Sequence, residues 1–345
     1  MDFLVEPRMA ITLLWMMLYI YSIMGSIDFG SSFWSMFYLR RNTTAGELAN
    51  RFLSPTWEIT NTTLVFVVVS LVGLFPVAAF TLGTVLLIPV SSILLLLTIR
   101  SAFMVFAYTL TGIEKLLRVV AGITGILIPT LLISALPVTE GGLVQMVNEQ
   151  PILLITKWLS SPAVYMYMLF GLTSALFLSA VFLSDYSLES DDPKAYRAYR
   201  RNALMIGPLA LISAMLALTL LEPEAQWLYE RLFRYLPWFI ASLVSFVLAY
   251  IALFLPARHK RFGIGRPRPA VLFVALQYLL ATFAYGSAHL PYIVYPFLTV
   301  SDAFTNINTF YSLLGTIAIG LAVLLPLFFL FWRLFLKDKR YLARR

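Results

Sequence analysis

The stretch ITLLWMMLYIYSIMGSIDFGSSFWSMFY, residues 11–38, decides the fold of this chain. It is long enough to cross a bilayer as a helix, which takes about 20 predominantly apolar residues. Its only charged residue is Asp28. Hydrocarbon makes an ionised side chain cost several kcal/mol, so acids within such spans usually serve a transport path or a partner. Asp28 is therefore the first functional candidate.

The composition of the whole chain is that of an integral membrane protein. Hydrophobic residues make up 60% and charged residues 12% of the 345 residues, whereas a soluble domain is nearer half apolar and a quarter charged. We expect one membrane domain over residues 1–345. The absence of cysteine excludes disulfides, thiolate metal sites and iron–sulfur clusters. The net charge of +8 does not indicate nucleic acid, because its basic residues cluster in short loops.

Nine apolar runs predict an all-α protein with nine transmembrane helices. Each is long enough to span a bilayer. They cover residues 11–38, 58–75, 77–99, 117–138, 163–184, 203–221, 237–255, 270–289 and 311–335.

The distribution of Lys and Arg predicts the orientation. Of the 25 basic residues, 21 fall at the ends of spans 1, 3, 5 and 7 and in the tail after span 9, and four fall on the other side. Cytoplasmic loops carry the excess of basic residues. We therefore expect the N-terminus outside and the C-terminus in the cytoplasm.

Local signals predict two helix starts and one short additional helix. Asp192-Pro193 suits an N-cap followed by a first helical residue, leading into span 6. Ser54-Pro55 has the same form at the start of span 2. Between spans 6 and 7, residues 222–235 mix apolar and charged side chains, which favours a short interfacial helix.

Small and polar residues form a stripe in the first span. Gly25, Asp28, Ser32 and Ser35 recur at steps of three and four, which places them on one helix face. Such a stripe can hold a chain of waters and pass protons toward the middle of the membrane. The alternative is interhelical packing, in which the hydroxyls and a protonated Asp28 serve as hydrogen-bonding groups between helices.

A second acid lies near the expected cytoplasmic surface. Glu58 follows Trp57 in the expected first turn of span 2, where the helix dipole favours negative charge. A surface acid followed by a deeper one, Asp28, is the order that a proton inlet needs. The alternative is a simple helix start with an interfacial tryptophan. Arg100, at the inner end of span 3, is interpreted as a snorkelling anchor.

Histidine is too scarce for a typical membrane haem site. The chain has His259 in a basic loop and His289 at the end of span 8. A haem with two histidine ligands from within the helices is excluded by this count. The sequence also lacks a Walker loop, HExxH and GxSxG motifs, and clustered acids that would hold a metal. We expect no cofactor, metal or catalytic residue in this chain.

Short motifs along the chain resemble subunit II of the cytochrome bd quinol oxidases. They are Ser26-Ile27-Asp28-Phe29-Gly30, Arg41-Asn42, Ser54-Pro55-Thr56-Trp57-Glu58, Phe75-Pro76, Arg100 and Leu290-Pro291-Tyr292 through Pro296. In two places the sequence departs from the family pattern. Gly25 replaces the first of two acids in span 1, and Glu58 stands where the family has Asp.

The resemblance implies a haem-free accessory subunit in a bacterial cytoplasmic membrane. It implies a fold of two four-helix bundles with the ninth helix at the periphery. The partner would be subunit I, which would carry two b-type haems and one d-type haem, oxidise quinol outside and reduce O₂ to water. A small single-span subunit, membrane lipid and quinone are further expected partners, and nucleic acid is not. This chain would stabilise subunit I and conduct cytoplasmic protons through Glu58, Asp28, Ser32 and Ser35.

Two other functions remain open at the level of sequence. A secondary transporter also carries an intramembrane acid, but transporters usually show repeated halves with matching broken helices, and Asp28 has no counterpart deep in the later spans. A purely structural assembly subunit would use Asp28 only to hold helices together.

Overall fold

The apolar runs form helices because a helix satisfies its own backbone N–H and C=O groups, as the interior of a bilayer requires. The computed structural model describes residues 5–39, 43–106, 112–148, 150–257 and 262–336. Within these ranges, nine helices are long and apolar enough to cross a membrane, which agrees with the nine expected runs. The long helices are α1 (Val5–Phe37), α2 (Thr44–Leu74), α4 (Leu87–Phe106), α5 (Glu114–Ile133), α8 (Pro162–Glu189), α9 (Pro193–Leu221), α11 (Leu236–Ala252), α12 (Pro267–His289) and α14 (Ile307–Leu336).

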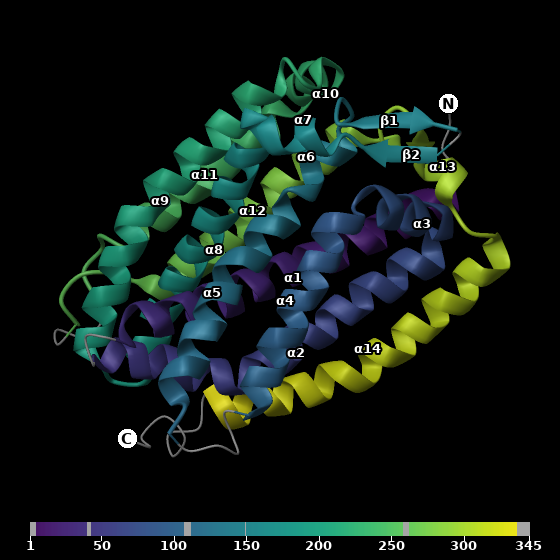
Figure 1. Cartoon of the computed structure of the whole chain (residues 1–345). Helices are drawn as coiled ribbons and strands as arrows, with labels where there is room; N and C mark the ends of the chain where they lie inside the picture. The colour runs from purple at the N-terminus through teal and green to yellow at the C-terminus, as the bar shows by residue number, and fades with distance from the viewer. Residues whose placement is uncertain (1–4, 40–42, 107–111, 149, 258–261, 337–345) are drawn as a thin grey trace.

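Short elements connect the long helices, most of them at the end of the molecule where α1 begins (Figure 1). Two antiparallel pairs of strands, β1 with β2 and β3 with β4, lie among these connections. A short helix lies between the sixth and seventh spans, where one was expected: it is α10, which continues into the short helix η2. The short elements are α3 (Pro76–Val85), α6 (Ala135–Thr139), β1 (Val144–Val147), β2 (Gln150–Leu153), α7 (Ile155–Ser160), α10 (Gln226–Leu232), η2 (Phe233–Tyr235), β3 (Tyr292–Val294), β4 (Leu298–Thr299) and α13 (Val300–Ala303).

Two helix starts were expected from a capping residue followed by proline, and one of them is confirmed while the other is wrong. The Asp192 carboxylate accepts hydrogen bonds from the first backbone N–H groups of α9, and Pro193 is the first helical residue. Ser54 does not begin a helix, because α2 starts ten residues earlier, at Thr44. The segment before Ser54 buries Ala45, Ala49 and other apolar side chains in the core. Burial of this face stabilises α2 across Ser54-Pro55, a local sequence that would otherwise favour the start of a new helix.

The third expected run is divided between two helices. Residues 77–99 cover most of α3 and the first part of α4, with a break at Leu86. Pro89 explains the break, because proline has no N–H to donate and its ring clashes with the carbonyl four residues earlier, here Val85. At its other end α4 extends to Phe106, so Arg100 lies inside a helix and not at its end.

The first helix is at the centre of the packing. It contacts α2, α5, α8 and α12, while α8 also packs on α9 and α5, and α11 packs on α12. The last helix, α14, lies along the outside of the molecule beside α2 (Figure 1). It ends at the opposite end of the molecule from the start of α1, as an odd number of crossings requires.

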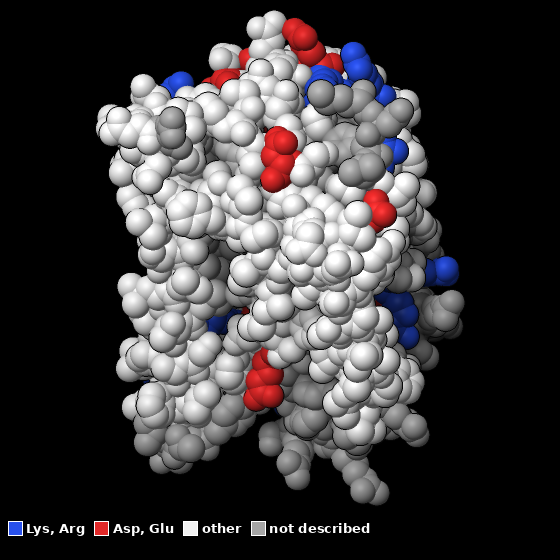
Figure 2. Space-filling model, turned by 90° about the vertical axis from the view of Figure 1, so that its right-hand side faces the viewer, with Lys and Arg blue, Asp and Glu red and all other residues white. Residues whose placement is uncertain are grey.

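The surface is mostly uncharged between its two ends. Large apolar side chains on the helices, such as Phe80, Leu95 and Ile319, are more than 60% exposed. Figure 2 shows charged side chains gathered at the end that carries α10 and the β-hairpins, above a mostly uncharged face with isolated acidic and basic side chains. This pattern suits contact with lipid or with a partner subunit. Several basic residues that set the expected orientation lie outside the described residues: Arg40, Arg41, Arg258, Lys260, Arg261 and those from Lys337 onward.

Candidate functional site

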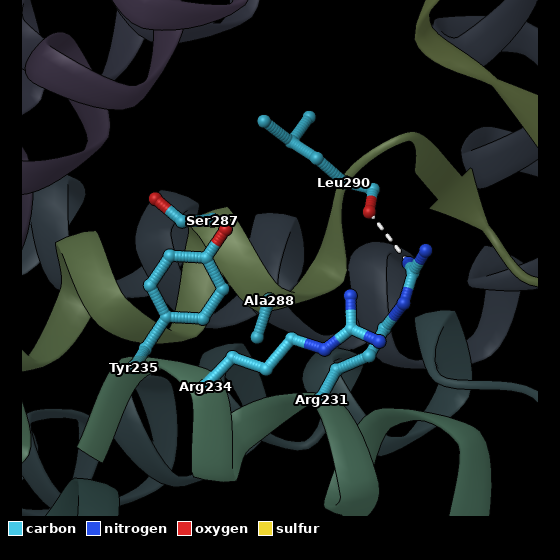
Figure 3. Close-up of a pocket in the computed structure, with 6 residues that line it drawn as sticks. All are labelled: Arg231, Arg234, Tyr235, Ser287, Ala288 and Leu290. Atoms are coloured by element: carbon cyan, nitrogen blue, oxygen red, sulfur yellow. Dashed lines mark hydrogen bonds between the residues drawn. The ribbon is translucent and has the colours of Figure 1, made fainter. Parts of the chain in front are cut away.

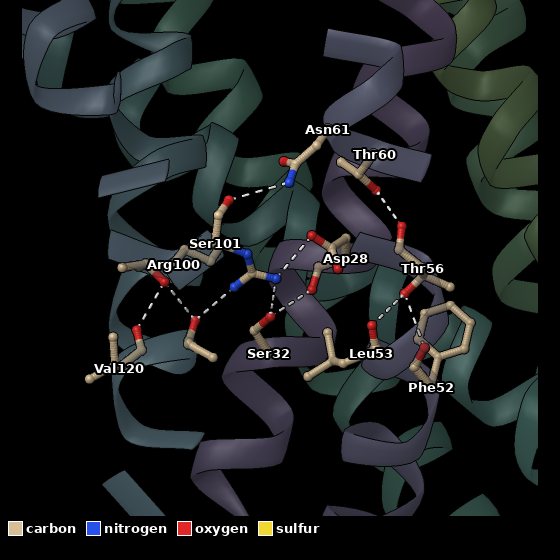
Figure 4. Close-up of polar contacts among 12 residues, drawn as sticks. Asp28, Ser32, Phe52, Leu53, Thr56, Thr60, Asn61, Arg100, Ser101 and Val120 are labelled. Carbon is tan, nitrogen blue, oxygen red and sulfur yellow. Dashed lines mark hydrogen bonds and ion pairs between the residues drawn. The ribbon is translucent and has the colours of Figure 1, made fainter. Parts of the chain in front are cut away.

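The polar stripe of α1 faces the interior of the protein. Gly25, Asp28, Ser32 and Ser35 are all buried, and Asp28 is only 2% exposed. The prediction that these residues share one helix face directed at neighbouring helices is thus consistent with the structure. Asp28 and Ser32 form the centre of a polar cluster between α1, α4 and α5 (Figure 4).

The partner of Asp28 is Arg100 of α4. The Arg100 guanidinium donates to Asp28 Oδ2 at 2.9 Å and to Ser32 Oγ at 2.6 Å. Its other terminal nitrogen donates to the backbone carbonyl of Ala121 in α5 at 3.0 Å. The interpretation of Arg100 as a snorkelling anchor is wrong: α4 continues beyond it, and its side chain is 3% exposed. Sequence reasoning noted this residue but missed its role.

This ion pair is poorly solvated on both sides. Each side chain is 3% exposed, so the pair has lost most of its hydration, and the desolvation cost is offset only if its hydrogen bonds are good. Arg100 meets this condition with three acceptors. Asp28 does not, because Oδ1 is buried and accepts no hydrogen bond from any described residue. One carboxylate oxygen is therefore committed to the pair, and the other has its acceptor capacity unused.

Two glycines allow the helices around Asp28 to come close. A Cβ on Gly125 of α5 would lie 2.5 Å from the Phe29 carbonyl oxygen and 3.0 Å from Ser32 Cβ. A Cβ on Gly30 of α1 would lie 2.1 Å from Ser179 Oγ of α8. Neither glycine position has room for a methyl group, so these two glycines set the position of α1 and hence of the Asp28 carboxylate.

The structure does not bring all predicted site residues together. Ser35 is buried on the same stripe, and its hydroxyl has no hydrogen-bond partner among the described residues. Glu58 of α2 is exposed, and no direct hydrogen bond or ion pair links it to Asp28. The polar cluster extends instead to the residue after Arg100, since Asn61 of α2 donates to Ser101 Oγ at 3.4 Å (Figure 4).

The one described histidine is held by a hydrogen bond and by aromatic neighbours. His289 Nδ1 is hydrogen-bonded to the Tyr292 carbonyl oxygen at 2.9 Å. Its ring packs against Tyr285, at 6.0 Å between centroids, and against Trp227, at 5.5 Å. Its other ring nitrogen, Nε2, is buried and has no hydrogen-bond partner among the described residues. His259 lies outside the described residues. In the described part of the chain, no three His, Asp or Glu side chains gather in a way that would hold a metal ion.

A second buried acid, which sequence reasoning missed, lies at the other end of the bundle. Glu140 follows α6 and is 2% exposed. The hydroxyls of Tyr167 and Tyr285 both donate to its Oε1, the first at 2.6 Å. Burial raises the pKa of Glu140 to about 7, the two tyrosine hydrogen bonds oppose this shift, and the Glu224 charge adds to it. An acid just after an apolar run is typical of a surface residue, so the sequence carried no signal of this burial.

Comparison with known proteins finds related sequences and a solved structure with a similar fold. A family model described as cytochrome bd terminal oxidase subunit II matches residues 7–335. A protein of Bacillus subtilis (strain 168), named provisionally as a cytochrome bd menaquinol oxidase subunit II, is 46% identical over 100% of this chain and 99% of its own length. A chain in the structure of the bd oxidase from Geobacillus thermodenitrificans aligns with a TM-score of 0.80 and 33% identity, covering 97% of this chain and 100% of that one.

Proposed function

This chain belongs to the cytochrome bd terminal oxidase subunit II family, and from that premise we propose that it stabilises a haem-bearing subunit I and conducts cytoplasmic protons to it. Its homologues are subunits of a quinol oxidase, an oxidoreductase complex. The family favours this function over a secondary transporter. The relative named as a menaquinol oxidase subunit supports menaquinol as the reductant.

The assembly we propose has the redox centres in the partner. Subunit I holds two b-type haems and one d-type haem in the bacterial cytoplasmic membrane, and a small single-span subunit, lipid and quinone complete the complex. The N-terminus of this chain is outside and its C-terminus is cytoplasmic. The helix contacts support two four-helix bundles, one of α1, α2, α4 and α5 and one of α8, α9, α11 and α12, with α14 at the periphery.

The observation that carries the proton-conducting role is the buried carboxylate of Asp28 with one oxygen unpaired. Oδ2 is held by Arg100, while Oδ1 is free to accept a proton or a water-mediated hydrogen bond. In the proposed path Glu58 is the inlet, Asp28 is the relay, and Ser32 and Ser35 line the route. Glu58 suits an inlet because it is exposed, and water between it and Asp28 would bridge the gap that no side chain bridges.

The path matters because the reaction separates charge. Protons for water formation come from the inside while quinol releases its own protons outside. Moving one charge across the membrane is worth about 2.3 kcal/mol per 100 mV. A narrow path through low-dielectric surroundings lets protons reach the haem site without dissipating that potential.

Substitution of Asp28 in the assembled complex tests this role. Asp28→Asn should slow quinol-dependent oxygen consumption per haem in the complex that assembles. Ser32→Ala should slow it to a smaller degree. Ser31→Ala is the matched control, because Ser31 is equally buried on the next face of α1 and lies off the path. Unchanged turnover of correctly assembled Asp28→Asn enzyme would remove the proton-conducting role.

A structural role is the second candidate, and one observation favours it. Through Asp28, Ser32 and Ala121, Arg100 connects α4 to both α1 and α5. If Asp28→Asn complex loses its haems in proportion to its activity, the ion pair serves assembly and not proton transfer. Haem content by optical spectrum separates the two candidates.

A further inference from the structure

A small cationic pocket lies at the end of the bundle that carries α10. It opens between the α10–η2 segment and the end of α12, and has a volume of about 80 Å³. One water needs only about 10–15 Å³ of such space, so the pocket has room for a polar group larger than water. Its walls are Arg231, Arg234, Tyr235, Ser287, Ala288 and Leu290 (Figure 3).

The positive charge in this pocket is not balanced by protein groups. Arg231 donates to the Leu290 carbonyl oxygen at 2.6 Å, and its guanidinium lies 5.7 Å from the Trp227 ring. Arg234 is exposed and makes no hydrogen bond or ion pair with any described residue. No carboxylate lines the pocket. Two like charges on adjacent turns repel each other, and an anion between them would turn this repulsion into attraction.

Hydroxyl groups beside the pocket can also donate to an anion. Tyr235 and Ser287 add two hydroxyl groups that can donate to the same anion.

The surroundings of the pocket are apolar and exposed. Phe233 is 58% exposed and Trp238 is 44% exposed, one on each side of Arg234 in the sequence. Along α11, Ile240 and Val244 continue the exposed apolar face at 52% and 53%. Aromatic side chains with arginine at the end of a membrane helix mark the level of lipid headgroups. A lipid with its phosphate in the pocket would therefore have apolar protein surface for its acyl chains.

We propose that Arg231 and Arg234 bind the phosphate of an anionic phospholipid, with Tyr235 and Ser287 as hydroxyl donors and α11 beside the acyl chains. Guanidinium groups suit this ligand because their planar N–H pairs match two phosphate oxygens. Inorganic phosphate has the same headgroup chemistry. The apolar face of α11 favours the lipid over the free ion.

Lipid binding to the purified complex tests the proposal. The complex is delipidated in neutral detergent and titrated with phosphatidylglycerol or phosphatidylcholine, and bound lipid is counted by native mass spectrometry. Wild type should bind phosphatidylglycerol more tightly. Arg234→Gln should weaken that binding about fivefold, the effect of losing about 1 kcal/mol for one basic residue near a headgroup. Arg234→Lys should retain most of it.

Arg8→Gln is the matched control, since it removes one positive charge at the same end of the protein but outside the pocket. It should leave phosphatidylglycerol binding unchanged. Equal losses in Arg8→Gln and Arg234→Gln, or no loss in either, would overturn the site. Displacement of the lipid by low millimolar inorganic phosphate would identify a free-ion site instead. No preference for phosphatidylglycerol over phosphatidylcholine would also overturn the proposal and would point to a carboxylate of a partner protein.

Discussion

Removal of both members of the Asp28–Arg100 ion pair should destabilise the chain by less than the sum of the two single removals. Arg100→Gln abolishes hydrogen bonds to Asp28, Ser32 and Ala121 and leaves a carboxylate that is 2% exposed without a counter-charge. Breaking a buried pair from one side costs about 3–5 kcal/mol. The same cost applies to Asp28→Asn, which leaves the guanidinium unpaired. In the double variant no buried charge remains, so the two losses should overlap by about 2–3 kcal/mol.

The assay is equilibrium unfolding of the full chain in mixed micelles by titration with SDS, followed by the fluorescence of its seven tryptophans. The control cycle uses Arg268 and Asp185, whose side chains are 60% and 19% exposed. A pair of this kind should show a coupling energy of about 0–1 kcal/mol. If the losses in unfolding free energy from Asp28→Asn and Arg100→Gln simply add, as in the control cycle, the reasoning that the two buried charges depend on each other is refuted.

Three further predictions concern other parts of the molecule. Burial raises the pKa of Glu140 from 4.5 to about 7, so folding favours the protonated acid. The free energy of unfolding should therefore fall by about 3 kcal/mol as pH rises from 4.5 to about 7. Glu140→Gln should remove this pH dependence in unfolding titrations. Gly30→Ala should cost about 1–3 kcal/mol, because its Cβ would collide with Ser179, whereas Gly83→Ala, with nothing within 4 Å, should be neutral or slightly stabilising in the same titration. The chain purified without its partner should show no Soret absorption, and a stoichiometric haem would contradict its assignment as the haem-free subunit.

Local periodicity was sufficient to predict nine long helices and the residues of the buried stripe. An apolar run of about 20 residues has few alternatives to a membrane helix, and steps of three and four fix which residues share a face. This is why Gly25, Asp28, Ser32 and Ser35 were predicted together. The Asp192-Pro193 start was predictable for the same reason, since an N-cap depends on the first turn of its own helix.

Contacts between distant segments were not predictable in this way. Arg100 and Asp28 are 72 residues apart, and an arginine near the end of an apolar run has the same local pattern whether it reaches the membrane surface or a buried acid. Glu140 is a similar case, because its partners come from α8 and α12. At Ser54 the local signal was overridden by tertiary burial of the preceding turns of α2.

The most direct test of the proton-conducting role is the rate of proton uptake by the assembled complex. The complex is placed in vesicles, and uptake from the side of the basic loops is followed during quinol oxidation for wild type and Asp28→Asn at equal haem content. The account predicts that Asp28→Asn slows uptake by about tenfold or more, while Ser31→Ala does not change it. Equal uptake rates in wild type and Asp28→Asn would contradict the account.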